Sequence, residues 1–114
     1  MIFEELDEFR KDLKKLVKKY RTLENDLETI KKVLKTEPKE RPPFSFRIDG
    51  LGIESRVIKI KKIACKSLKG KGINTGLRLI YAYFEEDQKI VFVEIYHKNT
   101  KKIENKTRIL KYFR

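Results

Sequence analysis

The chain has little of what disulfide-linked, zinc-binding and membrane proteins depend on. Its 114 residues include one cysteine, one histidine and no tryptophan. The lone Cys65 excludes an internal disulfide and suits a reducing compartment, and one His with one Cys argue against a zinc site built from these ligands. No apolar run approaches a membrane span, and the acidic residues 1–5 do not resemble a secretory signal. We therefore expect a cytoplasmic protein with no metal, no small-molecule cofactor and no membrane partner.

Acidic residues are scarce in one part of the chain only. Residues 1–40 hold 11 Lys/Arg and 10 Asp/Glu, whereas residues 41–114 hold 18 Lys/Arg and 7 Asp/Glu, a net charge of +11. A polyanion is the natural partner of such a segment. An anionic membrane normally requires a basic amphipathic helix or a lipid anchor, and here the densest charge lies in strand-like sequence. The length fits one domain over residues 1–114.

The neutral part of the chain predicts a short strand and a helical hairpin. Residues 2–6 form the strand, and Asp7 is a suitable N-cap for a helix over 8–20 with an apolar stripe. Thr22 caps a second helix that ends before Pro38. Because the link is very short, the two helices should be antiparallel. The lysines that fall largely outside the stripe are interpreted as a solvated face: Lys14, Lys15, Lys18 and Lys19.

The basic part predicts three strands and a final helix. Alternating, β-branched sequence favours strands over residues 56–65, 77–85 and 89–97, with a hairpin turn at 86–88 and a Gly-rich basic loop at 67–76. A helix is expected over residues 103–112. The order is β-α-α-β-β-β-α, which indicates an α+β domain with its helices packed on one face of an antiparallel sheet.

A run of cations in this part has no acidic residue within it. The eight cations are Arg56, Lys59, Lys61, Lys62, Lys66, Lys69, Lys71 and Arg78. Lys59 and Lys61 point to the same face of a strand, where an anion would relieve their repulsion; the alternative is a solubilising strand face. Arg78 begins an apolar strand, so it requires a phosphate or an internal carboxylate such as Glu94. His97, the only histidine, is a candidate for proton transfer.

Four segments of the chain form a recognisable set: residues 9–16 (FRKDLKKL), 58–61 (IKIK), 76–81 (GLRLIY) and 91–98 (VFVEIYHK). Together they resemble the RelE/ParE superfamily of toxins from toxin–antitoxin systems. The resemblance to RelE implies a RelE-like fold and a metal-independent endonuclease that enters the ribosome and cleaves mRNA, with a cognate acidic antitoxin as partner. It implies that Arg78 holds the scissile phosphate, that Lys59 and Lys61 bind or polarise it, and that His97 lies near the position where some relatives carry a catalytic histidine.

The remaining cations extend this predicted site into an RNA-binding surface. They are Lys62, Lys66, Lys69, Lys71 and Lys98. Attack by a 2′-OH requires a proton acceptor, and lysines crowded by other cations are candidate bases because crowding lowers the pKa of an ammonium group. ParE-type members share the fold but poison DNA gyrase and cut no RNA. Two alternatives therefore stay open: a non-enzymatic gyrase poison and a plain RNA-binding domain.

Overall fold

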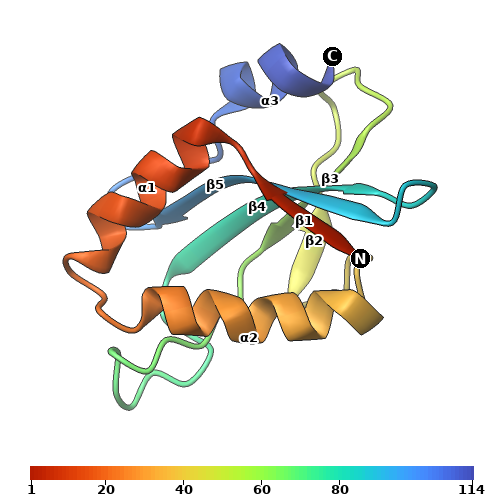
Figure 1. The fold of residues 1–114 in the computed structure, drawn as a ribbon. Helices are drawn as coiled ribbons and strands as arrows, with labels where there is room; N and C mark the ends of the chain where they lie inside the picture. The colour runs from red at the N-terminus through yellow and green to blue at the C-terminus, as the bar shows by residue number, and fades with distance from the viewer.

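The computed structural model describes residues 1–114 as five strands and three helices. The α+β prediction is confirmed, with one strand more than expected (Figure 1). The elements are β1 (Ile2–Glu5), α1 (Asp7–Val17), α2 (Leu23–Thr36), β2 (Ser45–Arg47), β3 (Arg56–Ile60), β4 (Leu77–Phe84), β5 (Lys89–His97) and α3 (Lys106–Phe113). No helix combines the length and the apolar composition that crossing a membrane requires.

The sheet is mixed and has the strand order β1-β5-β4-β3-β2. The strands β2 to β5 pair with antiparallel neighbours, but β1 lies parallel to β5, with Ile2 opposite Lys89. The expectation of an antiparallel sheet is therefore wrong for β1. A parallel neighbour must be reached by a long connection, and here nearly the whole chain separates the two strands. The three-residue β2, which the sequence analysis missed, forms the other edge of the sheet beside β3.

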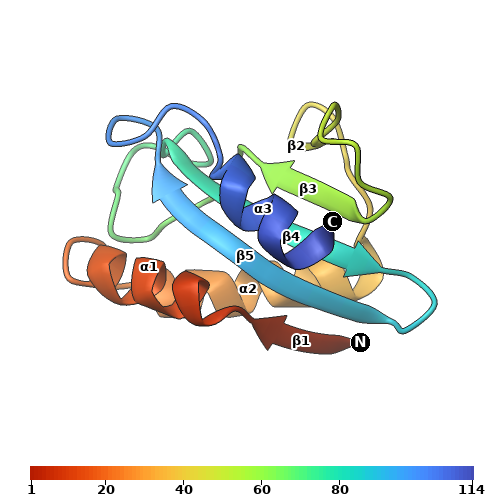
Figure 2. The ribbon, with the colours of Figure 1, turned by 90° about the horizontal axis from the view of Figure 1, so that it is seen from above.

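Helices cover both faces of the sheet, not one. On the first face, α1 and α2 bury Phe9, Leu23 and Leu27 against a core that includes Tyr81 and Phe92. On the opposite face α3 packs alone (Figures 1 and 2) and buries Ile109. Ile109 belongs to one buried cluster with the strand residues Val57, Ile80, Ala82, Val91, Val93 and Tyr96. The reason is that β4 and β5 are apolar on both sides, and strands of this kind require cover on both faces.

Several element ends differ from the sequence-based expectations. The helix α1 ends at Val17 rather than near Tyr20, which is buried in the turn before α2. Asp7 is the first residue of α1 and not its N-cap, which is Leu6. Thr22 is the N-cap residue of α2, but its side chain accepts no bond from the first turn and donates instead to Asp26. The Thr22 backbone N–H donates to Ser67 Oγ at 2.9 Å, which ties the start of α2 to the loop between β3 and β4. The strand expected over 56–65 ends at Ile60, and α3 begins at Lys106 after the N-cap Asn105.

Candidate nucleic-acid interface

Three strands bring their cations to one end of the sheet. In the antiparallel register, Ile60 at the end of β3 lies opposite Leu79 near the start of β4. Leu77, the first residue of β4, lies opposite His97 at the end of β5. Four cations that adjoin these strand ends therefore gather there; we call them the basic end of the sheet: Lys61, Lys62, Arg78 and Lys98. None of the four forms a salt bridge with a carboxylate.

Lys59, Lys61 and Arg78 share the face of the sheet that α3 covers. Lys59 lies opposite Ile80, two residues from Arg78, and Arg78 lies opposite Tyr96. Ile80 and Tyr96 belong to the core under α3, and side chains two residues apart on a strand share a face. The Lys61 ammonium lies 5.2 Å from the ring centroid of Phe46, the β2 residue opposite Lys59, so it projects to the same side. The structure therefore brings together three of the four predicted catalytic residues.

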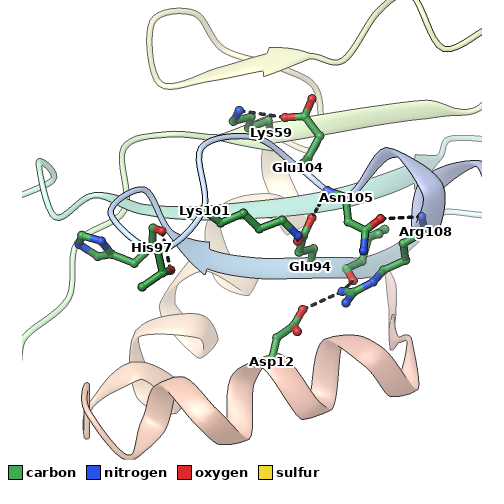
Figure 3. A network of polar contacts seen from close by, with 10 residues as sticks. Asp12, Lys59, Glu94, His97, Lys101, Glu104, Asn105 and Arg108 are labelled. Atoms are coloured by element: carbon green, nitrogen blue, oxygen red, sulfur yellow. Dashed lines mark hydrogen bonds and ion pairs between the residues drawn. The ribbon is translucent and has the colours of Figure 1, made fainter.

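The guanidinium of Arg78 has no carboxylate partner. Its Nη1 donates to the backbone oxygens of Lys61 at 3.0 Å and Leu77 at 3.3 Å, which leaves Nε and Nη2 without a protein acceptor. The alternative hypothesis of an ion pair with Glu94 is wrong, because Lys101 and the backbone N–H of Asn105 bind that carboxylate (Figure 3). Nε and Nη2 form one edge of the guanidinium, the geometry that grips a phosphate or carboxylate with two parallel hydrogen bonds.

Lys59 is already paired within the protein. Its ammonium lies 2.9 Å from Glu104 Oε1, and the two side chains are only 14% and 10% exposed (Figure 3). Burial lowers the pKa of Lys59, but Glu104 and Tyr96 outweigh it, so the pKa is raised above its ordinary value. Burial likewise raises the pKa of Glu104, and the bond from Lys59 reverses this to a net decrease. The expectation of a base with a lowered pKa is therefore wrong for Lys59, which remains a cation.

The segment between β5 and α3 folds over this face. Glu94 of β5 is only 2% exposed and accepts bonds from Lys101 and from the backbone N–H of Asn105, at 2.7 Å for the latter. These bonds hold the segment 98–105 in place and set Glu104 against Lys59 (Figure 3). The neighbouring Tyr96 is 5% exposed, and its buried hydroxyl lies near the Lys59 ammonium, but the hydroxyl proton has no acceptor within hydrogen-bond distance. A buried polar group without a partner is rare in native proteins and calls for an explanation.

His97 lies on the other face of the sheet from Arg78. It follows Tyr96 in β5, and successive strand residues alternate between faces. Both ring nitrogens are engaged: Nδ1 accepts from the backbone N–H of Asn99 at 3.1 Å, so Nε2 carries the proton and donates to the Thr75 oxygen at 2.9 Å. The ring stacks on Tyr20 at 6.0 Å between centroids. The structure thus does not bring His97 to the three predicted catalytic cations, and its contacts join the α1–α2 turn to the sheet.

The close approach at Gly76 predicts a large loss of stability for Gly76→Ala. Gly76 has φ +85°, and a Cβ there would lie 2.7 Å from Nε2 of His97, whereas Gly70 has φ +78° with open space around it. We expect Gly76→Ala to lower the free energy of unfolding by about 2–4 kcal/mol, from left-handed strain plus the clash. Gly70→Ala, the matched control, should lower it by only about 1–2 kcal/mol. Urea unfolding measures both, and equal losses would contradict the role assigned to His97.

The predicted RNA-binding lysines extend the basic end toward the helices. The Lys62 ammonium donates to Asn74 Oδ1 at 2.8 Å. The exposed Lys66, Lys69 and Lys71 follow in the loop between β3 and β4, and this loop docks on the start of α2, where the Ser67 backbone N–H donates to Thr22 Oγ1 at 2.9 Å. These three lysines also lack carboxylate partners and continue the positive surface onto the face that α1 and α2 cover.

A further group of cations, which was not predicted from the sequence, lies at this end. Lys18, Lys19 and Arg21 are exposed in the turn between α1 and α2. Tyr20 in the same turn stacks on His97, and Thr22 contacts Ser67 of the basic loop. Lys18 and Lys19 are exposed, as expected for a solvated surface, but they lie just after the end of α1 at Val17 and not on its helical face. The buried Tyr20 between basic residues was the available signal that this turn packs against the sheet.

No three His, Cys, Asp or Glu side chains come together in a group that could hold a metal ion. Cys65 is buried, and its Sγ lies 3.7 Å from Thr22 Oγ1, between α2 and the basic loop. Comparison of the chain with protein-family models, curated proteins and solved structures finds no match.

Proposed function

We propose that the protein is a RelE-like toxin that binds mRNA on the ribosome through the basic end of the sheet and cleaves it. The observation that carries the proposal is Arg78, a guanidinium without a carboxylate partner at an open sheet end. Lys61 and Lys59 lie on the same face beside it. A cation in an apolar strand is unfavourable unless an anion meets it. A phosphate of single-stranded RNA supplies that anion.

The geometry suggests how these residues divide the work of cleavage. Arg78 holds the scissile phosphate with Nε and Nη2, and the exposed Lys61 stabilises the added negative charge. The 2′-oxygen bonds to phosphorus as the bond from phosphorus to the 5′-oxygen breaks, and the 2′-OH proton passes to solvent water. Lys59 remains protonated, which suits stabilisation of the leaving oxygen rather than acceptance of a proton. The proposal assigns His97 to positioning of the sheet end instead of catalysis, since both its nitrogens are bound within the protein.

The positive charge of the surface supports the two partners that the family resemblance implies, an acidic antitoxin and the ribosome. The basic end, the basic loop and the α1–α2 turn join into a surface that contains no carboxylate within residues 56–78 or 98–103. An acidic antitoxin that folds on contact would neutralise this surface and cover Arg78. The ribosome offers the same surface a dense array of phosphates, which speeds association by electrostatic steering.

One observation favours a non-enzymatic alternative. Lys59 is tied to Glu104, so of the three predicted catalytic cations on this face only Lys61 and Arg78 are free to meet an anion. Such a surface would serve a gyrase poison or a plain RNA-binding domain equally well.

The test is to incubate the protein with ribosomes on a defined mRNA and to map the new 5′ ends, with gyrase supercoiling measured in parallel. Ribosome-dependent cleavage is the expected result. Gyrase inhibition without cleavage would replace the proposal with the ParE-like alternative.

Salt dependence gives a separate test of RNA binding. If the basic end and loop contact about four to six phosphates, log K for a single-stranded oligoribonucleotide should fall with log salt at a slope of roughly −3 to −4. The double variant Lys69→Gln/Lys71→Gln should reduce that slope by roughly 1 to 1.5, while Lys14→Gln/Lys15→Gln on α1 should leave it unchanged. Fluorescence anisotropy across a salt series measures this. An affinity that is insensitive to salt would contradict phosphate binding by these lysines.

A further inference from the structure

Tyr96 and Glu104 meet at Lys59, and neither is explained by the fold alone. Tyr96 is 5% exposed with an unpartnered hydroxyl, although ordinary cores bury such a group only when it is bonded. Glu104 comes from the segment 98–105 and places a carboxylate on Lys59 in the face that also holds Arg78. Burial raises the pKa of Tyr96, and a hydrogen bond from the nearby Lys59 ammonium opposes this more weakly. An ammonium group can only donate, so the proton of the Tyr96 hydroxyl is still without an acceptor.

We propose that Lys59 and the Tyr96 hydroxyl form a phosphate-binding position, that the Glu104 carboxylate blocks it by binding Lys59 alone, and that an RNA phosphate binds both donors when Glu104 leaves. The proposal rests on the proposed function and adds to it a binding residue, Tyr96, and a built-in competitor, Glu104. A hydroxyl without a partner in the free protein is a donor that an incoming phosphate oxygen can satisfy. A carboxylate held on a lysine is the nearest protein equivalent of a bound phosphate.

The segment that carries Glu104 is suited to move. It runs from Lys98 to Asn105 outside any helix or strand, and Ile103 within it is 55% exposed. Its backbone is held at both ends, by bonds from Asn99, Thr100 and Lys101 to His97 and by the bond from the Asn105 N–H to Glu94. Because none of these bonds involves Lys59, the Glu104 side chain can rotate away from Lys59 while the segment stays anchored. Lys101 and Lys102 in the same segment would remain close to the RNA.

The proposal predicts that stability and RNA binding change in opposite directions in two variants. Tyr96→Phe removes a hydroxyl that has no partner in the free protein, so Tm should rise by about 2–5 °C. It also removes a donor to phosphate, so affinity for a short oligoribonucleotide should fall about 5- to 10-fold. Glu104→Gln leaves Lys59 without its counter-charge, so Tm should fall, whereas the loss of the competing carboxylate should strengthen RNA binding about 10-fold.

Matched controls separate these effects from general changes in the sheet. Tyr83→Phe alters another buried strand tyrosine on the face that α1 and α2 cover. Glu40→Gln breaks the ion pair with Arg56 at the other end of β3. Neither should change RNA affinity by more than about 2-fold.

The experiment is a thermal melt and an anisotropy titration with a short oligoribonucleotide for the native protein, these four variants and Arg78→Ala. Opposite shifts in Tm and affinity for both Tyr96→Phe and Glu104→Gln support the proposal. A lowered Tm for Tyr96→Phe with unchanged affinity would show a structural hydroxyl and overturn it. If Glu104→Gln does not fold, Tyr96→Phe alone decides. If the native protein does not bind RNA, the proposed function fails together with this inference. If binding depends on Arg78 but not on Tyr96 or Glu104, this inference alone fails.

Discussion

Replacement of Arg78 by alanine should abolish RNA cleavage while the protein still folds. The guanidinium forms bonds only to two backbone oxygens, so its loss should lower the free energy of unfolding by about 1 kcal/mol. Loss of one preorganised donor to the transition state lowers a rate by about 10²–10³-fold. Arg78→Lys should recover only part of this, because an ammonium group cannot grip a phosphate with two parallel bonds.

A matched control is Arg47→Ala on β2, whose contact to Asp49 is a surface pair at 3.8 Å. It should leave both the cleavage rate and Tm nearly unchanged. Cleavage of ribosome-bound mRNA gives the rates, and thermal melting gives the stabilities. Severe destabilisation by Arg78→Ala would show that the arginine supports the fold. A stable variant with full cleavage would remove Arg78 from the mechanism.

The elements that could be predicted are those whose residues, close together in the sequence, show a regular spacing of apolar side chains. The apolar stripes and the short link identified α1 and α2, which run in opposite directions (Figure 2). The turn at residues 86–88 and the alternating sequence on both sides identified the hairpin of β4 and β5. Lys61 lies near Arg78 because β3 and β4 are antiparallel neighbours, and before the structure was known this grouping rested on the family resemblance and not on a local pattern. In a helix or strand that depends on neighbouring residues, apolar residues recur at the spacing of that element, and this spacing can be recognised in the sequence.

The parts that could not be predicted depend on contacts between distant residues. The strand β1 pairs with β5 across almost the entire chain, and no local pattern records that partner. The strand β2 has three residues, too few to show alternation. The side of the sheet that α3 covers depends on its connection, since Val91 and Val93 offer a second apolar face that either end of the chain could bury. The bond between Lys59 and Glu104 spans 45 positions in the chain.

The β-bulge in β5 shows how these distant contacts affect the site. The register between β4 and β5 shifts at Ile80 and Tyr81, so Val93 has no partner there, and Val93 and Glu94 both turn toward the side that α3 covers. A bulge re-aims side chains and bends the strand. As a result Glu94 reaches the segment 98–105 and fixes it over Lys59. The position of Glu104 in the candidate site therefore depends on an irregularity that alternation alone does not predict.

Arg108 closes the edge of the sheet next to this bulge. The strand β1 ends at Glu5, and the next residue, Leu6, still donates its backbone N–H to the Phe92 oxygen at 3.1 Å. Beyond that point Arg108 of α3 takes over, because its Nη1 donates to the Val93 oxygen at 2.9 Å and to Asp12 of α1 at 2.7 Å (Figure 3). One side chain thus joins α3, β5 and α1 around the sheet edge, which connects the helices of the two faces.

Replacement of Arg108 by alanine should therefore destabilise the protein more than any other single change of a charged residue considered above. Arg108 is 13% exposed and Asp12 24%, so the change leaves a largely buried carboxylate and the Val93 oxygen without their donor. We expect a loss of about 3–4 kcal/mol in the free energy of unfolding and a fall in Tm of roughly 10–20 °C. Arg10→Ala is the matched control, since Arg10 is 63% exposed and pairs with Glu5 at 3.4 Å on the surface; its effect should stay within about 0.5 kcal/mol.

Urea unfolding measures the stability of both variants. Together with Asp12→Ala and the double variant Asp12→Ala/Arg108→Ala, it also gives the coupling between Asp12 and Arg108. If Arg108→Ala proves as mild as Arg10→Ala, the contact between α3 and α1 does not stabilise the fold, and the placement of α3 over the candidate site must depend on Ile109 and its apolar neighbours alone.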